Sequence, residues 1–280
     1  MKILIIGGTS ALAVSLIKTL EKEHTIITAG RKNCDIYFNL NEDIDACSFP
    51  KDIDIVLHIA ASFGGQTYLE FKDAISVNVI GTLRVSQLTK ELNVKHLILI
   101  SSMYVCLSVC SPYYTQYALT KKQSEEVALL FAKENNLNLT ILRPTQIYGN
   151  DISFAKNQPF FYHMLEKAKK GENITIYGNH DALRNYIYED DLNEIIKRVI
   201  EKKVIGVFYC GTMIDVSYSE IAKSAQLIYG NGGEVVFFRD KENIPDNVFD
   251  KDNTLYEKIN YYPNTNITKS IENIFKQGKI

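Results

Sequence analysis

The sequence predicts an α/β protein built on a doubly wound parallel sheet, with a smaller C-terminal α/β part. Short apolar runs without polar alternation recur over the first 144 residues, which is typical of strands buried on both faces. Stretches with helical periodicity separate these runs, as crossovers between parallel strands require. The first run ends at Gly7 and Gly8, and a helical pattern follows at once, which indicates a tight strand-to-helix turn.

The elements follow in chain order. Five apolar runs are expected to form strands: Lys2–Ile6, His24–Thr28, Asp54–Ala60, His96–Ser101 and Leu139–Pro144. Two helical stretches between them are Leu12–Glu21 and Gln116–Asn135. Beyond about Asn150 the alternation weakens, and shorter strands are expected at Ile174–Tyr177, Gly206–Cys210 and Val235–Phe238. We therefore predict a nucleotide-binding domain over residues 1–150, to which about 186–212 returns, and a mainly substrate-binding part over 151–280.

Composition excludes several classes of function. The formal net charge of −2 gives no electrostatic reason to expect binding to nucleic acid or to an anionic membrane. No apolar run approaches the ~20 residues that span a bilayer. The five cysteines are odd in number and form no CxxC pair, so we expect reduced thiols and no metal site. A cytoplasmic protein that acts on a small molecule is the expectation.

The opening turn departs from the usual dinucleotide-binding pattern of three glycines. Gly7 serves the tight turn, but Ser10 and Ala13 stand where the second and third glycines would be. Both residues are small, and the Ser10 hydroxyl could contact a phosphate or cap the helix. A cofactor site and a plain strand-to-helix turn both remain open at this point.

The end of the second strand bears on the choice of cofactor. An NAD site usually has a carboxylate there for the ribose 2′-hydroxyl, whereas this chain has Gly30 and Arg31. A guanidinium suits a 2′-phosphate, so NADP(H) is favoured over NAD. An ordinary solvated arginine is the alternative.

The segment YALTK, Tyr117 to Lys121, indicates acid–base chemistry. Tyrosine and lysine four residues apart share one helix face, and a nearby ammonium is expected to lower the phenol pKa. Ser102, in ISSMYV, follows a strand at the sheet edge where open α/β sheets bind ligands. Its hydroxyl could bind the same substrate oxygen.

Six segments occur in one order along the chain: Asp54–Ala61, Asn78–Thr82, Ile100–Val105, Tyr117–Lys121, Ile141–Asn150 and Gly178–Leu192. Over nearly its whole length, the sequence resembles the extended short-chain dehydrogenase/reductases, the sugar-nucleotide epimerase/dehydratase/reductase family. The resemblance implies a Rossmann fold, a nicotinamide cofactor, a sugar-nucleotide substrate of polysaccharide biosynthesis and a homodimer. It implies the catalytic residues Ser102, Tyr117 and Lys121.

The resemblance also implies the binding residues. Those expected at the cofactor are Gly7, Thr9, Ser10, Ala11, Leu12, Arg31, Asn39, Leu40, Ala60, Ala61, Asn78, Ser101, Tyr117, Lys121, Pro144 and Thr145. Those expected at the substrate are Ser62, Phe63, Ser102, Met103, Tyr104, Tyr177 and Arg184. Arg184 is the candidate for the substrate diphosphate, because a guanidinium matches phosphate geometry. A surface salt bridge is its alternative role.

Departures from the family pattern reduce the number of reactions that the sequence allows. Family dehydratases carry an Asp–Glu pair directly after the catalytic serine or threonine, where this chain has Met103 and Tyr104, so dehydration is disfavoured. Met103 also replaces the cysteine of fucose-synthase-type double epimerases, and it cannot titrate. Cys106 lies nearby and is expected to be buried.

Two oxidoreductase reactions and one binding function remain. The first is NADPH-dependent reduction of a keto-sugar nucleotide, expected to be a 4-keto-6-deoxy sugar, with the hydride from NADPH and the proton from Tyr117. The alternative is NAD(P)-dependent epimerisation at C4 of a sugar nucleotide. A non-catalytic, NADP(H)-sensing binding protein is the second alternative.

Overall fold

The computed structural model describes residues 1–43 and 45–278. Lys279 and Ile280, at the end of the expected substrate-binding part, lie outside the described residues. The chain forms two compact units. The first unit comprises Met1–Pro144, Asn193–Tyr209 and Asp252–Asn260, and the second comprises Thr145–Leu192, Cys210–Lys251 and Tyr261–Ile280.

A seven-stranded sheet forms the centre of the first unit, in the order β11-β6-β5-β4-β1-β2-β3. Neighbouring strands from β3 to β6 pair in parallel. The strands are β1 (Lys2–Ile6), β2 (Thr25–Gly30), β3 (Ile36–Tyr37), β4 (Ile55–His58), β5 (His96–Ile100), β6 (Asn138–Pro144) and β11 (Gly206–Cys210). The doubly wound α/β fold predicted from the sequence is confirmed, while the short β3 was not expected.

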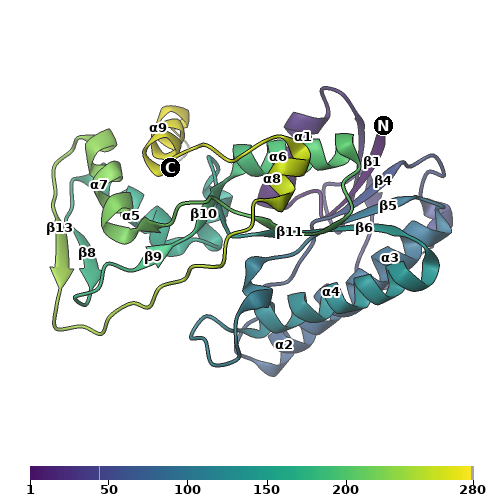
Figure 1. The fold of residues 1–280 in the computed structure, drawn as a ribbon, viewed down its shortest axis with the longest axis horizontal. Coiled ribbons are helices and arrows are strands. Elements are labelled where there is room, and N and C mark those ends of the chain that lie inside the picture. Colours follow the sequence, from purple (N-terminus) through teal and green to yellow (C-terminus); the bar gives the residue numbers. More distant parts are fainter. Residues whose placement is uncertain (44, 279–280) are drawn as a thin grey trace. The chain divides into compact units, whose positions relative to one another are not determined.

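Helices cover both faces of this sheet. Figure 1 shows α3 and α4 on one face, with α1 and α6 on the other. The helical elements are α1 (Ala11–Leu20), α2 (Tyr68–Ala74), α3 (Gly81–Glu91), α4 (Gln116–Asn135), α6 (Glu189–Lys202), α8 (Thr254–Ile259), the π-helical η2 (Ile75–Ile80) and the 3-10 turns η1 (Ala46–Ser48) and η3 (Met103–Cys106). Among the described residues, none of the helices combines the length and the apolar character that crossing a bilayer requires.

The strands are continuous apolar runs because the helices bury them on both sides. Leu4, Val56, Leu97 and Leu139 pair in register across four neighbouring strands. All four side chains are at most 5% exposed and belong to one core cluster. This row of close-packed side chains fixes the register, because a slip of one residue would send the row to the other face.

The strand order reverses at β1, which lies between β2 and β4. Doubly wound sheets bind ligands beside such a reversal, at the carboxyl ends of the strands. Gly7 follows β1 with φ +94°, and a Cβ there would lie 2.7 Å from the Ala60 backbone nitrogen beyond β4. Only glycine allows this close approach.

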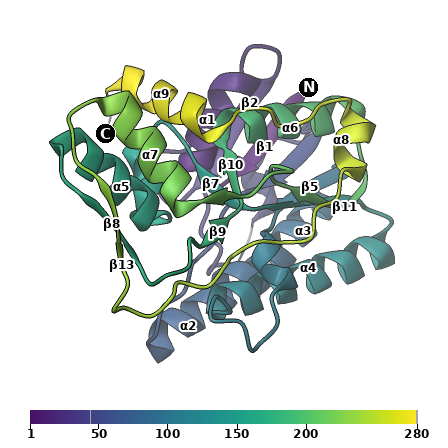
Figure 2. The same ribbon diagram turned by 60° about the vertical axis from the view of Figure 1, so that its left-hand side comes forward.

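The second unit consists of short paired strands and three longer helices. Strand β10 pairs with β7 and β13 with β8 in parallel, and β12 pairs with β9 antiparallel. Helix α7 packs against both α5 and α9 (Figure 2). The elements are β7 (Gln146–Tyr148), η4 (Ile152–Lys156), α5 (Pro159–Lys170), β8 (Ile174–Tyr177), β9 (Leu183–Arg184), β10 (Tyr186–Tyr188), β12 (Val216–Ser217), α7 (Tyr218–Tyr229), β13 (Val235–Phe238) and α9 (Ile267–Gln277).

Aromatic side chains fill the centre of the second unit. The Tyr148 ring lies 4.8 Å from Phe161, 5.6 Å from Tyr186 and 5.5 Å from Tyr188, between ring centroids. The Tyr148 hydroxyl donates a 2.7 Å hydrogen bond to Ser270 Oγ, so the polar end of this buried ring has a partner. Aromatic packing thus holds together a unit whose sheets are too small to do so.

Candidate active site

The turn between β1 and α1 leads directly into a capped helix N-terminus, the kind of site that binds phosphate groups. Ser10 is the N-cap of α1, and its Oγ accepts a hydrogen bond from Ala13 N at 3.2 Å. The turn itself is closed by Ser10 N donating to Gly7 O at 3.1 Å. The start of α1, which includes Ala11 and Leu12, presents the positive end of the helix dipole. Thr9 is the exposed residue at the tip of the turn. Ser10, at the position of the second glycine of the usual pattern, therefore caps α1.

The end of β2 presents one arginine and one carboxylate. Arg31 is exposed and makes no ion pair with any part of the chain that the structure describes. Asp35 folds back onto β2, where its Oδ2 accepts hydrogen bonds from Thr28 N at 2.8 Å and from Thr28 Oγ1 at 2.7 Å. The Thr28 backbone hydrogen bond and then its hydroxyl lower the Asp35 pKa. Sequence reasoning missed this carboxylate, because it lies five residues beyond Gly30.

Asn39 and Leu40 are held by their own neighbourhood. Asn39 Nδ2 donates to Glu42 Oε1 at 2.6 Å, and Asn39 Oδ1 accepts from Asn41 N at 3.1 Å. Arg84 Nη1 donates to Leu40 O at 2.6 Å. The Asn39 side chain is therefore committed within its turn, while Leu40 offers a buried apolar surface.

The carboxyl ends of β4 and β5 carry further predicted cofactor residues. Ala60 N donates to Ile6 O at 3.0 Å, which brings Ala60 and the following Ala61 against the glycine turn. Ser101 is 2% exposed, and its Oγ has no hydrogen-bond partner among the described residues. An orphaned buried hydroxyl at the carboxyl end of the sheet, the end where the glycine turn and the N-terminus of α1 also lie, is what a bound dinucleotide would complete. The residues present fit this group.

Ser102, Tyr117 and Lys121 meet beyond the carboxyl end of β5. Ser102 begins η3, and its Oγ accepts from Tyr104 N at 3.2 Å. The Ser102 side chain also hydrogen-bonds Tyr117. Lys121, one turn along α4 from Tyr117, is 2% exposed and donates from Nζ to Ile100 O at 2.6 Å. The predicted catalytic residues are therefore close together in one unit.

Burial controls the protonation of both groups. Burial raises the pKa of Tyr117 to about 12, with the Ser102 hydrogen bond acting in the opposite direction and nearby Tyr104 adding to the rise. Burial lowers the pKa of Lys121 to about 8, against the attraction of Glu125. The expected lowering of the Tyr117 pKa by Lys121 is wrong for this arrangement, because burial outweighs other influences and the ammonium is directed to Ile100 O.

Asn78 connects the β4 loop to the catalytic helix. Its Nδ2 donates to Ser62 O at 2.7 Å and to Thr120 Oγ1 at 2.9 Å, and its Oδ1 accepts from Ser62 N at 2.8 Å. Asn78 is 2% exposed and lies in the π-helical η2, a type of distortion that is frequent at functional sites. The contacts seen are thus to protein, and they position residues Ser62 and Thr120.

The other residues around η3 differ in how far they are exposed to solvent. Met103 is buried, and Tyr104 lies edge-on to Tyr117 with ring centroids 6.4 Å apart. Cys106 is exposed, which corrects the expectation of a buried thiol, because η3 turns it outward to 3.8 Å from Arg143 Nη1. Arg143 also binds the buried Glu125 carboxylate, with Nη2–Oε2 at 2.6 Å.

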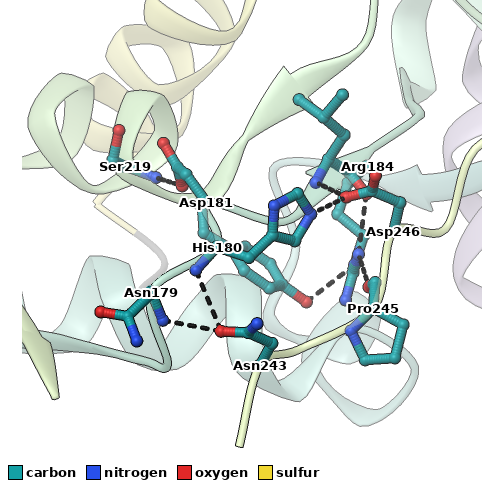
Figure 3. A network of polar contacts seen from close by, with 10 residues as sticks. Asn179, His180, Asp181, Arg184, Ser219, Asn243, Pro245 and Asp246 are labelled. Carbon is teal, nitrogen blue, oxygen red and sulfur yellow. Dashed lines mark hydrogen bonds and ion pairs between the residues drawn. The ribbon is translucent and has the colours of Figure 1, made fainter. Parts of the chain in front are cut away.

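Arg184 is part of a polar network in the second unit (Figure 3). It is 2% exposed, its Nε donates to the Tyr218 hydroxyl at 2.8 Å, and its Nη1 donates to Leu183 O and Pro245 O at 2.7 and 2.8 Å. Asp246 Oδ1 accepts from Leu183 N at 2.7 Å and lies 2.7 Å from His180 Nε2. The guanidinium is thus oriented by the protein.

The remaining predicted residues are on strands or strand ends. Tyr177, in β8, is 49% exposed and packs edge-on to Phe238. Thr145 is 5% exposed, and its Oγ1 has no hydrogen-bond partner among the described residues. Pro144 is the buried last residue of β6. A groove of about 1130 Å³ between η4 and α5, lined by Phe160 and His163 among others, includes none of the predicted site residues.

Comparison with known proteins identifies the family. Residues 3–211 match the NAD dependent epimerase/dehydratase family. The chain belongs to this family. The resemblance recognised in the sequence is therefore confirmed, and nicotinamide cofactors are what this family uses.

Individual members of the NAD dependent epimerase/dehydratase family are distant. The dTDP-D-glucose 4,6-dehydratase of Dictyostelium discoideum is 26% identical over 271 residues, covering 79% of this chain and 61% of the relative. The UDP-glucose 4-epimerase of Vibrio cholerae is 24% identical over 247 residues, covering 79% of this chain and 74% of the relative. The chain spans about three fifths of the length of the Dictyostelium protein and of Protein CapI from Staphylococcus aureus, 61% and 58%.

A solved structure has the same fold. The UDP-glucuronic acid 4-epimerase of Bacillus cereus, in complex with NAD, superposes with a TM-score of 0.80 and 20% identity, covering 100% of both chains. At this identity the likeness concerns the fold.

Proposed function

We propose that this protein transfers a hydride between a nicotinamide cofactor and a carbon of a sugar nucleotide. The observation that carries the proposal is the meeting of Ser102, Tyr117 and Lys121 at the carboxyl end of β5, in the same unit as the glycine turn. A bound nicotinamide would supply or accept the hydride at this place. The side chains at this place would transfer the proton and bind the substrate oxygen.

Each side chain has a distinct task. Tyr117, whose pKa is raised to about 12, is a neutral phenol at physiological pH and can give its proton to a carbonyl oxygen as the carbon is reduced. Ser102 already hydrogen-bonds the phenol and can bind the same oxygen. Lys121, which the family resemblance places at the cofactor, would bind the cofactor ribose.

Net reduction of a keto-sugar nucleotide with NADPH is the reaction that we propose. The exposed Arg31 guanidinium, uncommitted among the described residues, is suited to a 2′-phosphate. Asp35 uses one carboxylate oxygen on Thr28, which makes it a weaker candidate for a ribose 2′-hydroxyl. A protonated Tyr117 can act as the proton donor that reduction requires.

C4 epimerisation is the second candidate. The Bacillus cereus 4-epimerase in complex with NAD shares the fold over the whole chain, and the Vibrio cholerae relative is also a 4-epimerase. The same three side chains could take a proton and return it. Such a reaction would leave the cofactor unchanged overall.

One assay separates these functions. NADPH oxidation should be followed with a panel of 4-keto-6-deoxy sugar nucleotides, and one NADPH should be consumed for each product formed. Interconversion of two sugar nucleotides without added cofactor would instead support the epimerase. Cofactor binding without turnover of any panel member would support the non-catalytic binding protein.

Two further assignments belong to this proposal. Arg184, oriented by Tyr218 and by two carbonyl groups, would bind the substrate diphosphate, and Arg184→Lys should then raise KM more than it lowers kcat.

A homodimer would cover the exposed leucines of α3 and α4, Leu83, Leu129 and Leu130, which are 44%, 43% and 57% exposed. Light scattering of the wild type and of Leu130→Glu tests the dimer.

A further inference from the structure

Phe63 lies flat against the proposed proton donor. Its ring and the Tyr117 ring are 4.7 Å apart between centroids and inclined by 17°, which is a stacked arrangement. Phe63 is 52% exposed, so one face of its ring covers Tyr117 while much of the remainder meets solvent. The resemblance placed Phe63 with the substrate, whereas the structure gives it a catalytic side chain as its partner.

The loop that carries Phe63 is fixed on both sides of the ring. The Asn78 side chain hydrogen-bonds both the backbone N–H and the backbone carbonyl of Ser62. Its Nδ2 also donates to Thr120, which lies one turn along α4 from Tyr117. Ser62 Oγ also donates to Asp73 Oδ2 at 2.8 Å. After Phe63, Gly64 has φ +71°, and a Cβ there would lie 3.2 Å from Gln116 Cβ. The backbone around Phe63 is therefore seated against the start of α4.

We propose that Phe63 is a positioning residue that holds the Tyr117 phenol in its proton-transfer orientation by ring stacking. The proposal rests on the proposed function of Tyr117. Tyr104 meets the same phenol edge-on, and Ser102 binds its polar end, so Phe63 supplies the flat face of a three-sided support. Stacking restricts rotation of the Tyr117 ring and keeps water from that face.

Four variants separate stacking from simple space filling. Phe63→Ala removes the ring, Phe63→Leu keeps apolar volume without a flat face, and Phe63→Tyr keeps the ring. Tyr68→Ala is the matched control, because Tyr68 is a 78% exposed aromatic residue of the neighbouring α2. We expect kcat to fall about two- to tenfold in the Ala and Leu variants, with KM for the cofactor unchanged and Phe63→Tyr near the wild type.

The pH dependence adds a readout that a merely structural role would not move. Because burial raises the Tyr117 pKa, uncovering the phenol should shift the high-pH limb of the kcat profile to lower pH in Phe63→Ala. Phe63→Leu, which still excludes water, should shift the limb less. An unchanged limb together with an unchanged kcat in Phe63→Ala would overturn the proposal.

Fluorine NMR of protein labelled with fluorotyrosine tests the stack without any substrate. The Tyr117 resonance is the one lost in Tyr117→Phe, and it should carry a ring-current shift that disappears in Phe63→Ala and stays in Phe63→Tyr. A resonance that does not move in Phe63→Ala overturns the stacking. If the wild type neither reduces nor epimerises any sugar nucleotide, the proposed function fails. The pH titration of the Tyr117 resonance in Phe63→Ala and Phe63→Tyr then still decides whether Phe63 affects the ionisation of the phenol.

Discussion

Lys121 should destabilise the fold that carries it, and the size of this effect can be worked out from its burial. The side chain is 2% exposed, and burial lowers its pKa from 10.5 to about 8. At about 1.4 kcal/mol per pKa unit, the protonated lysine costs the folded state about 3 kcal/mol. Lys121→Met keeps the length of the side chain and removes the charge, so it should remove this cost.

The sign follows from proton binding. Between pH 8 and 10.5 the unfolded chain keeps the Lys121 proton while the folded protein has released it, so the free energy of unfolding rises with pH in this window. Below about pH 8 the cost is fully present. Lys121→Met also leaves Ile100 O without its donor, a loss of about 1–3 kcal/mol at every pH. The variant should therefore match or exceed the wild type near neutral pH and fall behind it above pH 10.5.

Urea unfolding of both proteins from pH 7 to 10.5 measures this directly. The difference in free energy of unfolding should change by about 3 kcal/mol across the series, whatever the hydrogen bond contributes. Lys122→Met, which alters an exposed neighbour, is the control and should give a flat difference. A flat difference for Lys121→Met as well would refute the reasoning, since it would mean that the ammonium is not desolvated.

Three further outcomes are expected. Tyr117→Phe should lower turnover by about 10²–10⁴-fold with NADPH affinity nearly unchanged, and Ser102→Ala should cost less; near-normal turnover by Tyr117→Phe would move the chemistry elsewhere. Arg31→Ala should weaken NADPH binding by about 1–3 kcal/mol in calorimetry and NADH binding little, and equal wild-type affinities would contradict this. Burial lowers the His58 pKa from 6.5 to about 3, so stability should fall as pH falls below 6.5, by ~3 kcal/mol at about pH 4, and His58→Leu should flatten that limb in acid unfolding.

The first unit was largely predictable, because its strands are buried on both faces and read as unbroken apolar runs. The runs at Lys2–Ile6 and His96–Ser101 became β1 and β5 almost to the residue. The second unit was harder to predict, since β9 and β12 have two residues each and depend on pairing with one another across 31 intervening residues. Strands this short leave no periodicity to detect.

The contacts between side chains in the candidate site could not be predicted from the sequence. The motifs placed Tyr117 and Lys121 on one helix face, but they did not show that burial would raise one pKa and lower the other. Asp35 and Phe63 were missed as partners of Thr28 and Tyr117, because both contacts join residues whose approach depends on loop geometry. Such contacts belong to tertiary structure and leave no local pattern.

The way the chain alternates between the two units constrains how it can fold during synthesis. The first unit needs β11, which ends at Cys210, and the segment Asp252–Asn260, so it cannot be completed until Asn260 has been made. Residues 145–192 leave the ribosome before the first unit has its last strand. The β6 edge of the nascent sheet therefore stays open until β11 has been made, and neither unit can be cut out as one continuous fragment.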